Sequence, residues 1–404
     1  MTENWVSKKQ KCAICGNDQK HVLFQQQFSK LSIGSLMNGY DVVICQSCGF
    51  AFADNIPDQT DFDLYYREMS KYEHQDYAGE PSEFETRQFP ALAHFIKKYI
   101  PTSQARILEI GCANGGLLNA LKQLGYLNIL GIDPSPVCAQ NAEQLYQIQV
   151  LTTALSDINV EIGQFDFIIL VAVLEHIQDL NGSLQKLHHL LTPAGKLYIE
   201  VPDATKFTSS PDAPFQEFSI EHISFFSPIS LANLLRAHFF LEVSSTQTSY
   251  NQTDTHTGHA IRMVFQKSNI NKKFDPVKDF ETEVELKKYI EASQKVEDRI
   301  HKTVNELVDG QQPLFVWGVG THTQRLLATS RLANAKIIAF VDSNPNYQDK
   351  QLNNIPIIHP KKLVGTSEPI LVSSRIFQSE IVYQIRFELK LQSNIFTLYE
   401  DKIK

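Results

Sequence analysis

The sequence lacks any apolar run of the roughly 18 residues that a membrane-spanning helix needs. Its first residues, MTENWVSKKQKC, lack the apolar block of a secretory signal. It also lacks an excess of positive charge. A net charge of −8 argues against broad nucleic-acid binding, because a surface that follows phosphates carries excess Lys and Arg. We therefore expect a cytoplasmic protein that binds neither membranes nor nucleic acids.

The composition is otherwise ordinary for a globular protein, with 43% hydrophobic and 20% charged residues. A chain of 404 residues is long enough for a large core and for roughly two to four domains.

An apolar stretch runs into a glycine-rich turn at residues 107–116, which read ILEIGCANGG. Such a turn brings the backbone close to a ligand and opens a helix whose free N–H groups face that ligand. The spacing differs from the dinucleotide fingerprint, since Ala113 stands where a glycine is often found. The next apolar strand, residues 128–132, ends in Asp133, about 20 residues on, where an acidic side chain accepts hydrogen bonds from ribose. Glu109 precedes the turn and can approach the charged end of the ligand.

Further segments continue the order of strand, turn and helix. Residues 165–170 form a nearly uninterrupted apolar run, as a buried parallel strand requires. Leu174, Glu175, His176 and Ile177 follow it at the carboxyl edge of the sheet, where open α/β sheets bind ligands. The pattern predicts an α/β fold with a seven-stranded sheet whose last two strands form a reversed hairpin. The other expected helices and strands lie at residues 82–99, 135–147, 148–152, 196–201, 240–246 and 259–266.

These motifs together, E-x-G-x-x-x-G, GID, FDFIILVAVLEHIQD and LLTPAGKLYIEVP, resemble the class I methyltransferases that use S-adenosylmethionine. The resemblance covers residues 80–268 and implies a Rossmann-like core that binds this cofactor. The alternative is a doubly wound domain that binds another nucleotide or none. The cofactor-binding residues that the resemblance implies are Glu109, Gly111, Cys112, Ala113, Asn114, Gly115, Asp133, Pro134, Ala154, Leu155 and Val171.

Four of the six cysteines form two C-x-x-C-G pairs about 30 residues apart, the spacing of a zinc site. Two disulfides or reduced free thiols are the alternatives; a reducing cytoplasm disfavours the former and the doubled spacing disfavours the latter. Four cysteine ligands leave no open position for water, so the site would be structural rather than catalytic. The predicted ligands are Cys12, Cys15, Cys45 and Cys48.

The long segment after residue 201 contains a Glu221-His222 pair followed by two phenylalanines and a Ser-Pro helix start. Long irregular segments in compact domains are usually functional or disordered. Histidine titrates near neutrality, so His222 can take a proton from carbon, although the same motif often only docks the loop. His176 can likewise act chemically or only shape the pocket. A tyrosine-rich connector at residues 61–77 either reaches over this site or packs the cysteine lobe against the core.

The last third of the chain begins with a charged segment, residues 275–309, that predicts one long amphipathic helix or a helix pair. Its apolar positions include Val284, Tyr289, Val296 and Ile300. LFVWGVGTHTQRLL and IIAFVDSNP then predict a second Rossmann-like unit, with Gly318 and Gly320 at its turn and Asp342 at a strand end. Such a unit could bind a dinucleotide or only cover the substrate. The predicted domains are residues 1–78 (zinc lobe and connector), 79–268 (methyltransferase core), 269–310 (helical linker) and 311–404 (Rossmann-like domain).

The whole arrangement resembles the sugar C-methyltransferases that act on nucleotide-linked keto-deoxysugars. The resemblance implies chemical roles for Glu221, His222 and His176, with a tyrosine, Tyr72 or its neighbours Tyr65 and Tyr66. Ser219 stands where members of the family often have tyrosine. The implied cofactors are S-adenosylmethionine and a structural Zn²⁺, and the implied partner is a nucleotide-linked sugar. An O- or N-methyltransferase, or a binding or scaffold protein with a degenerate core, is the alternative.

Overall fold

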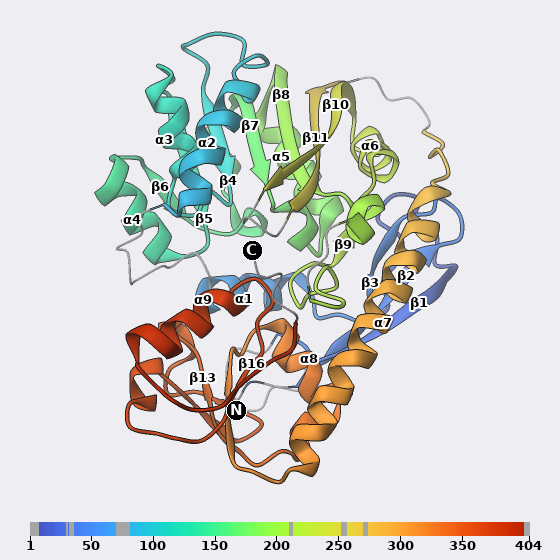
Figure 1. The fold of residues 1–404 in the computed structure, drawn as a ribbon. Helices are drawn as coiled ribbons and strands as arrows, with labels where there is room; N and C mark the ends of the chain where they lie inside the picture. Colours follow the sequence, from blue (N-terminus) through green and yellow to red (C-terminus); the bar gives the residue numbers. More distant parts are fainter. Residues whose placement is uncertain are drawn as a thin grey trace.

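The computed structural model describes residues 8–29, 31, 36–69, 81–209, 213–251, 257–269 and 274–399. The strands of this part of the chain form three sheets of four, seven and six strands. Figure 1 shows the seven-stranded sheet with its helices at the top, the four-stranded sheet at the right, and the six-stranded sheet below. The long helix α7 (Glu281–Asp309) runs down one side of the molecule, from the four-stranded sheet to the six-stranded sheet (Figure 1).

The seven-stranded sheet has the order β10-β11-β8-β7-β4-β5-β6, which confirms the expected class I methyltransferase fold. The strands from β8 to β6 are parallel, whereas β11 runs antiparallel to both β8 and β10 and so forms the expected reversed hairpin. The strands are β4 (Ile107–Ile110), β5 (Ile129–Asp133), β6 (Val150–Thr152), β7 (Phe165–Val171), β8 (Leu191–Pro202), β10 (Phe240–Asn251) and β11 (Thr257–Lys267).

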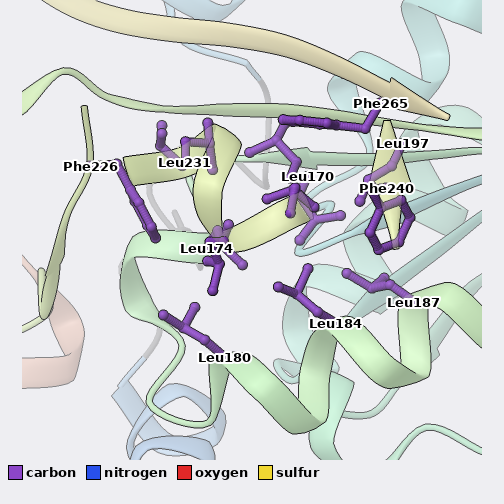
Figure 2. Close-up of a cluster of buried hydrophobic side chains, with 14 of the residues drawn as sticks. Leu170, Leu174, Leu180, Leu184, Leu187, Leu197, Phe226, Leu231, Phe240 and Phe265 are labelled. Atoms are coloured by element: carbon purple, nitrogen blue, oxygen red, sulfur yellow. The ribbon is translucent and has the colours of Figure 1, made fainter. Parts of the chain in front are cut away.

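Helices cover both faces of this sheet because successive residues of each strand point to opposite sides. Ile107 and Phe167 pack with helices α2 (Glu83–Ile96) and α3 (Gly116–Gln123), whereas Leu108 and Ile168 pack with α5 (Leu180–Leu190) and α6 (Pro228–Ala237). Figure 2 shows the leucines of α5 pointing toward strand residues such as Leu170 and Leu197. Helix α4 (Pro136–Tyr146) begins at the Ser135 cap, whose side chain accepts a hydrogen bond from the Cys138 N–H.

The four-stranded antiparallel sheet carries the N-terminal lobe and has the order β1-β2-β3-β9. Its strands are β1 (Lys20–Gln27), β2 (Gly39–Cys45), β3 (Ala51–Asp54) and β9 (Ser224–Phe225). The last of these strands comes from the loop that contains Glu221 and His222. The lobe is followed by helix α1 (Gln59–Met69), where the sequence had indicated only a connector. Phe62 is fully buried, so this segment is part of the lobe's core; Tyr72 lies outside the described residues.

Helix α7 is one continuous helix that begins at Glu281, later than the expected start at residue 275. Leu286 and Tyr289 pack in the cluster that contains β2, and Ile300 and Val304 pack in the core of the C-terminal sheet. Val284 was expected on the apolar face but is 50% exposed, because it lies two positions from each of the buried residues Thr282 and Leu286 and so on the opposite side of the helix. The segment therefore joins two cores.

The six-stranded sheet has the order β14-β15-β13-β12-β16-β17, and only β14 runs antiparallel to its neighbour. This is the second Rossmann-like sheet, and helices α8 (Thr321–Thr329) and α9 (Gln378–Tyr383) accompany it. Its strands are β12 (Leu314–Trp317), β13 (Ile337–Val341), β14 (Gln351–Leu352), β15 (Ile355–Ile358), β16 (Ile370–Val372) and β17 (Ile395–Thr397).

Candidate functional site

The glycine-rich turn between β4 and α3 forms a tight backbone bend at the carboxyl edge of the sheet. Gly111 has a φ of +67°, Ala113 of +44° and Gly115 of +77°, all in the left-handed region. A Cβ at Gly111 would lie 2.5 Å from the Cγ2 atom of Val173, so no other residue fits there without displacing Val173. This close approach places the turn directly beside the segment that follows β7.

Two buried carboxylates stand next to this turn. Asp133, at the end of β5, accepts hydrogen bonds from the backbone N–H groups of Ala113 and Ser135, each at 2.9 Å. Glu109 is buried, and its desolvation together with the nearby charge of Asp133 raises its pKa well above the usual range. Its Oε2 atom has no hydrogen-bond partner among the described residues. An unsatisfied buried acceptor beside a second carboxylate fits a cationic ligand that also presents hydroxyl groups, as S-adenosylmethionine does.

The remaining predicted cofactor residues surround the same turn in different ways. Cys112 is buried against Gly131, and Asn114 accepts a hydrogen bond from the side chain of Asn141 at 3.1 Å. Pro134, Ala154 and Val171 are half-buried at or just after strand ends. The Leu155 side chain packs in the main hydrophobic core, so its backbone is the part that faces away from that core.

The two predicted catalytic histidines lie together beyond the ends of β7 and β8. His176 belongs to the short 3₁₀ helix Leu174–His176, and His222 belongs to the loop after β8. Their ring centroids are 5.0 Å apart. The His176 Nδ1 atom lies 3.0 Å from the carbonyl oxygen of Glu221, which can only accept. A proton on Nδ1 satisfies this contact, whereas an unprotonated Nδ1 can accept from the Tyr66 hydroxyl, so the partner that Nδ1 engages sets the tautomer.

Two tyrosines of helix α1 contact His176 and the neighbouring Glu221. The Tyr66 hydroxyl lies 2.9 Å from His176 Nδ1, and the Tyr65 hydroxyl donates to Glu221 Oε1 at 3.1 Å. Burial and the charge of Glu221 raise the pKa of Tyr65 well above its usual range, so its hydroxyl stays protonated. Both rings also pack against the core of the N-terminal lobe. The structure thus combines the two roles that the sequence left open for these tyrosines.

Residues to which the sequence assigned no chemical role also shape the site. The Ser219 hydroxyl accepts hydrogen bonds from the backbone N–H groups of Glu221 and His222, at 3.3 and 3.1 Å. The buried Glu175 places its Oε1 atom 3.7 Å from His176 Nε2, and its carbonyl accepts from the Ile223 N–H. The sequence feature that could have identified Glu175 as a site residue is its position directly before His176 in the LEH motif.

The four cysteines of the N-terminal lobe form one compact cluster of free thiols. Their sulfur atoms all lie within 4.8 Å of one another, and the Cys12–Cys48 and Cys15–Cys45 separations are both 3.5 Å. Zn–S bonds of about 2.3 Å place two sulfurs of a tetrahedron roughly 3.8 Å apart, so the cluster fits a zinc ion.

Each cysteine pair is closed by a glycine in the left-handed region. Gly16 has a φ of +69° and Gly49 of +80°, and their N–H groups donate to the carbonyls of Cys12 and Cys45 at 2.9 Å. A Cβ at Gly49 would collide with the carbonyl oxygen of Asp279, just before α7. The second turn is therefore packed against the helix that joins the lobes.

The turn of the C-terminal sheet repeats the arrangement at Asp133. Asp342, at the end of β13, accepts from the backbone N–H groups of Val319 and Asn344 at 3.1 and 2.9 Å. Burial raises the pKa of Asp342. Gly318 has a φ of +107°, and no described atom would lie within 4 Å of a Cβ at Gly320.

Two family models match the chain. Residues 84–240 match a model described as a methyltransferase domain, and residues 310–394 match one described as C2185-like, N-terminal. The first match contains strands β4 to β8 of the sheet that has the class I strand order. The chain therefore contains a class I S-adenosylmethionine-dependent methyltransferase domain.

Known proteins are similar to parts of this chain. A ubiquinone biosynthesis O-methyltransferase from Xylella fastidiosa is 31% identical over 122 residues, which cover 29% of this chain and 49% of that protein. One from Xanthomonas oryzae pv. oryzae is 26% identical over 122 residues, covering 29% and 51%. The chain thus spans about half the length of the curated relatives it matches. The structure of a 1,6-didemethyltoxoflavin-N1-methyltransferase from Burkholderia thailandensis aligns with a TM-score of 0.40 and 20% identity, over 56% of this chain and 98% of that chain.

The methyltransferase domain supplies only part of the site. The glycine turn, His176, Glu221 and His222 lie within residues 84–240, whereas Tyr65 and Tyr66 precede that range. In the described part of the chain, no helix is both long and apolar enough to cross a membrane.

Proposed function

We propose that the protein is an S-adenosylmethionine-dependent methyltransferase that methylates a carbon atom of a nucleotide-linked keto-deoxysugar. The observation that carries this proposal is the contact between the Glu221-His222 loop and His176 beside the glycine turn, where Tyr65 and Tyr66 also converge. A reaction at carbon needs a base and a hydrogen-bond donor for the enolate oxygen. This cluster contains candidates for both.

The cofactor would be held by the turn from Gly111 to Gly115, with Asp133 toward the ribose and Glu109 toward the charged end. When bound, it supplies the methyl group on a sulfonium. The contact of Gly111 with Val173 supports this placement, because it brings the turn next to the residues that lead to His176.

In the proposed reaction, His222 removes a proton from the carbon next to the ketone. The electron pair of that C–H bond becomes an enolate, whose carbon would take the methyl group from the sulfonium of bound S-adenosylmethionine; the C–S bond would break with its electron pair left on sulfur, and the proton leaves His222 for solvent. Glu221 orients the loop, since its carboxylate is held by Tyr65 and its carbonyl by His176. The enolate oxygen accepts a hydrogen bond from His176 or from a tyrosine.

We also propose that Cys12, Cys15, Cys45 and Cys48 bind one structural Zn²⁺. Four sulfurs this close together would complete a tetrahedral shell around the ion and leave no position for a substrate. Three of these cysteines pack in the same core cluster as Phe50, Phe52 and Phe226, which supports a role in joining the lobe to the methyltransferase domain.

A second candidate is methyl transfer to oxygen or nitrogen. It is favoured by the curated relatives, which are named as O-methyltransferases. An acceptor of this kind is already nucleophilic, so positioning does most of the work and no carbon acid has to ionise.

The deciding experiment is incubation with S-adenosylmethionine and a panel of nucleotide-linked 4-keto sugars, followed by mass spectrometry with fragmentation. Carbon methylation places the added mass on a ring carbon, where acid or base does not release it. A product methylated on oxygen or nitrogen would replace the first proposal with the second.

A further inference from the structure

The loop that carries Glu221 and His222 is held by side chains from other parts of the molecule. The Ser293 hydroxyl and the Tyr289 hydroxyl, both on α7, accept from the backbone N–H groups of Phe215 and Glu217 at 3.2 and 3.0 Å. The Tyr40 hydroxyl on β2 donates to the carbonyl of Ser219 at 2.8 Å. The conformation of the loop therefore depends on the lobe and on α7 as well as on the methyltransferase sheet.

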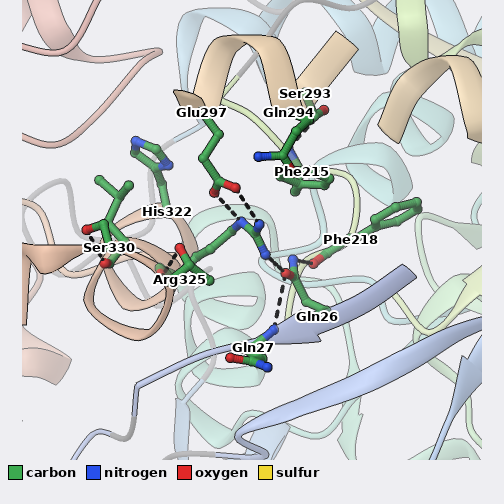
Figure 3. Close-up of polar contacts among 12 residues, drawn as sticks. Gln26, Gln27, Phe215, Phe218, Ser293, Gln294, Glu297, His322, Arg325 and Ser330 are labelled. Atoms are coloured by element: carbon green, nitrogen blue, oxygen red, sulfur yellow. Dashed lines mark hydrogen bonds and ion pairs between the residues drawn. The ribbon is translucent and has the colours of Figure 1, made fainter. Parts of the chain in front are cut away.

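A buried ion pair lies behind this loop, as Figure 3 shows. Arg325 on α8 binds Glu297 on α7 in a bidentate manner, with Nε–Oε1 and Nη2–Oε2 distances of 2.7 and 2.8 Å. The side chains are only 4% and 3% exposed. The remaining terminal nitrogen of Arg325, Nη1, donates to the Oε1 atom of Gln26 on β1.

Gln26 relays this contact to the loop. The guanidinium group can only donate, and the backbone N–H of Gln27 also donates to Gln26 Oε1, at 3.3 Å. The amide orientation of Gln26 is therefore determined, and its NH₂ group faces the other way. That group donates to the carbonyl of Phe218 at 2.6 Å, directly before Ser219.

The same arginine restrains a second point of the loop. Phe215 has a φ of +59°, a conformation that residues with a side chain adopt only where the surroundings impose it. Its ring lies 4.1 Å from the guanidinium carbon of Arg325 and stacks on Phe24 at a centroid distance of 4.4 Å. Both ends of the segment 215–218 are thus held by groups connected to Arg325.

We propose that Arg325, acting through Gln26, is a positioning residue for the Glu221-His222 pair, so that the C-terminal domain sets the geometry of the methyltransferase site. A buried ion pair is often no more stabilising than apolar residues of the same size. Its bidentate hydrogen bonds, however, form only when the two side chains take one specific arrangement. We call Arg325, Glu297, Gln26 and the Phe218 carbonyl the Arg325 network. This network connects α8, α7, β1 and the loop. The catalytic part of this inference rests on the role proposed above for His222.

The sharpest test is Gln26→Met, which keeps the size and burial of the side chain and leaves the Arg325–Glu297 pair intact. We expect faster amide hydrogen exchange in residues 215–223, a kcat about tenfold or more lower on a verified substrate, and a cofactor Kd within about twofold of the wild type. The matched control is Gln25→Met on the same strand, because Gln25 is exposed and its side chain donates to Asp41, away from the loop. This control should change none of the three readouts.

A second variant, Arg325→Lys, keeps the charge but cannot bind Glu297 and Gln26 together. We expect it to reproduce the loop exchange and the lower kcat of Gln26→Met. A lower melting temperature with unchanged loop exchange and unchanged kcat in both variants would overturn the proposal, because it would make the network a general stabiliser. Loop exchange that rises while kcat stays at the wild-type value would support the anchoring of the loop but overturn the positioning role in catalysis.

The exchange measurement needs no substrate, so the two proposals can fail separately. If the wild-type protein methylates no keto sugar on carbon and Gln26→Met still loosens the loop, the proposed reaction is wrong and the anchoring of the loop is supported.

Discussion

The Asp133 carboxylate accepts a hydrogen bond from the backbone N–H of Ala113 at 2.9 Å, and so connects the end of β5 to the glycine turn. It also accepts from the Ser135 N–H at the start of α4. A carboxylate has about four acceptor positions, so these bonds leave it able to accept hydroxyl groups as well. One side chain thus shapes the turn, and in our proposal it also binds the ribose.

We expect Asp133→Ala to weaken S-adenosylmethionine binding by on the order of tenfold or more, since hydrogen bonds to a charged acceptor are typically worth roughly 1.5–3 kcal/mol. Isothermal titration calorimetry measures this directly. Asp133→Asn is the control, because it keeps one acceptor for the Ala113 N–H, and it should bind with intermediate affinity. An unchanged Kd in the alanine variant would place the ribose elsewhere.

The raised pKa of Glu109 predicts that cofactor affinity depends on pH. Burial and the charge of Asp133 raise this pKa in the free protein, and a bound cation lowers it again. Between the two pKa values binding releases a proton, so the affinity rises with pH, by at most about tenfold per pH unit for one proton. Calorimetry in two buffers with different ionisation enthalpies gives the number of protons released.

Glu109→Gln should remove this proton release and flatten the pH dependence while weakening binding overall. Equal pH profiles for the wild type and the variant would show that another group titrates on binding.

Reaction at carbon predicts exchange of substrate hydrogen with solvent. With a verified keto sugar in heavy water, the enzyme should incorporate deuterium next to the ketone, even when S-adenosylhomocysteine occupies the cofactor site. His222→Ala should abolish exchange and transfer, because a proton-transfer residue contributes roughly 10²–10⁴ in rate, and should leave the cofactor Kd within about twofold. Mass spectrometry of the recovered sugar gives the exchange rate.

The structure adds a comparison with His176→Ala. The His176 ring lies beside that of His222, with centroids 5.0 Å apart, so this residue is the next candidate for the base. Exchange that survives in His222→Ala but disappears in His176→Ala would move the role to His176. Glu221→Gln should cause a smaller loss than His222→Ala.

The cysteine cluster predicts one zinc ion per chain. Elemental analysis of protein prepared without chelator should find it, and Cys45→Ser should lose it and unfold the N-terminal lobe at a lower temperature, because metal binding is coupled to folding. Cys138→Ser is a suitable control, since Cys138 is a buried cysteine of α4 outside the cluster. Wild-type protein free of zinc would contradict the assignment.

Local patterns in the sequence were sufficient to predict the central sheet and much of the site. The glycine turn, Asp133 and the apolar strand before His176 lie at β4, β5 and β7, and each has a recognisable pattern of its own. The carboxyl ends of parallel strands meet at one edge, so the pattern also predicted that these residues lie together.

The contacts that hold the loop had no such pattern. Arg325 and Gln26 are 299 positions apart, and both belong to residue types that are usually exposed. Helix α1 was missed for a related reason, since its polar residues do not predict that Phe62 is fully buried. Only the three-dimensional arrangement brings Tyr66 to His176 and Tyr65 to Glu221.

The pairing of β9 with β3 has a consequence for fragments of this chain. Phe225 and Ser224 pair with Ala51 and Phe52, and the Ala53 N–H donates to the carbonyl of Ile223 at 2.8 Å. A fragment that ends before residue 213 would leave this side of β3 as an open edge with unpaired N–H and C=O groups beside an apolar strand. Such edges pair with other chains, so the isolated cysteine lobe should self-associate even when its metal is bound.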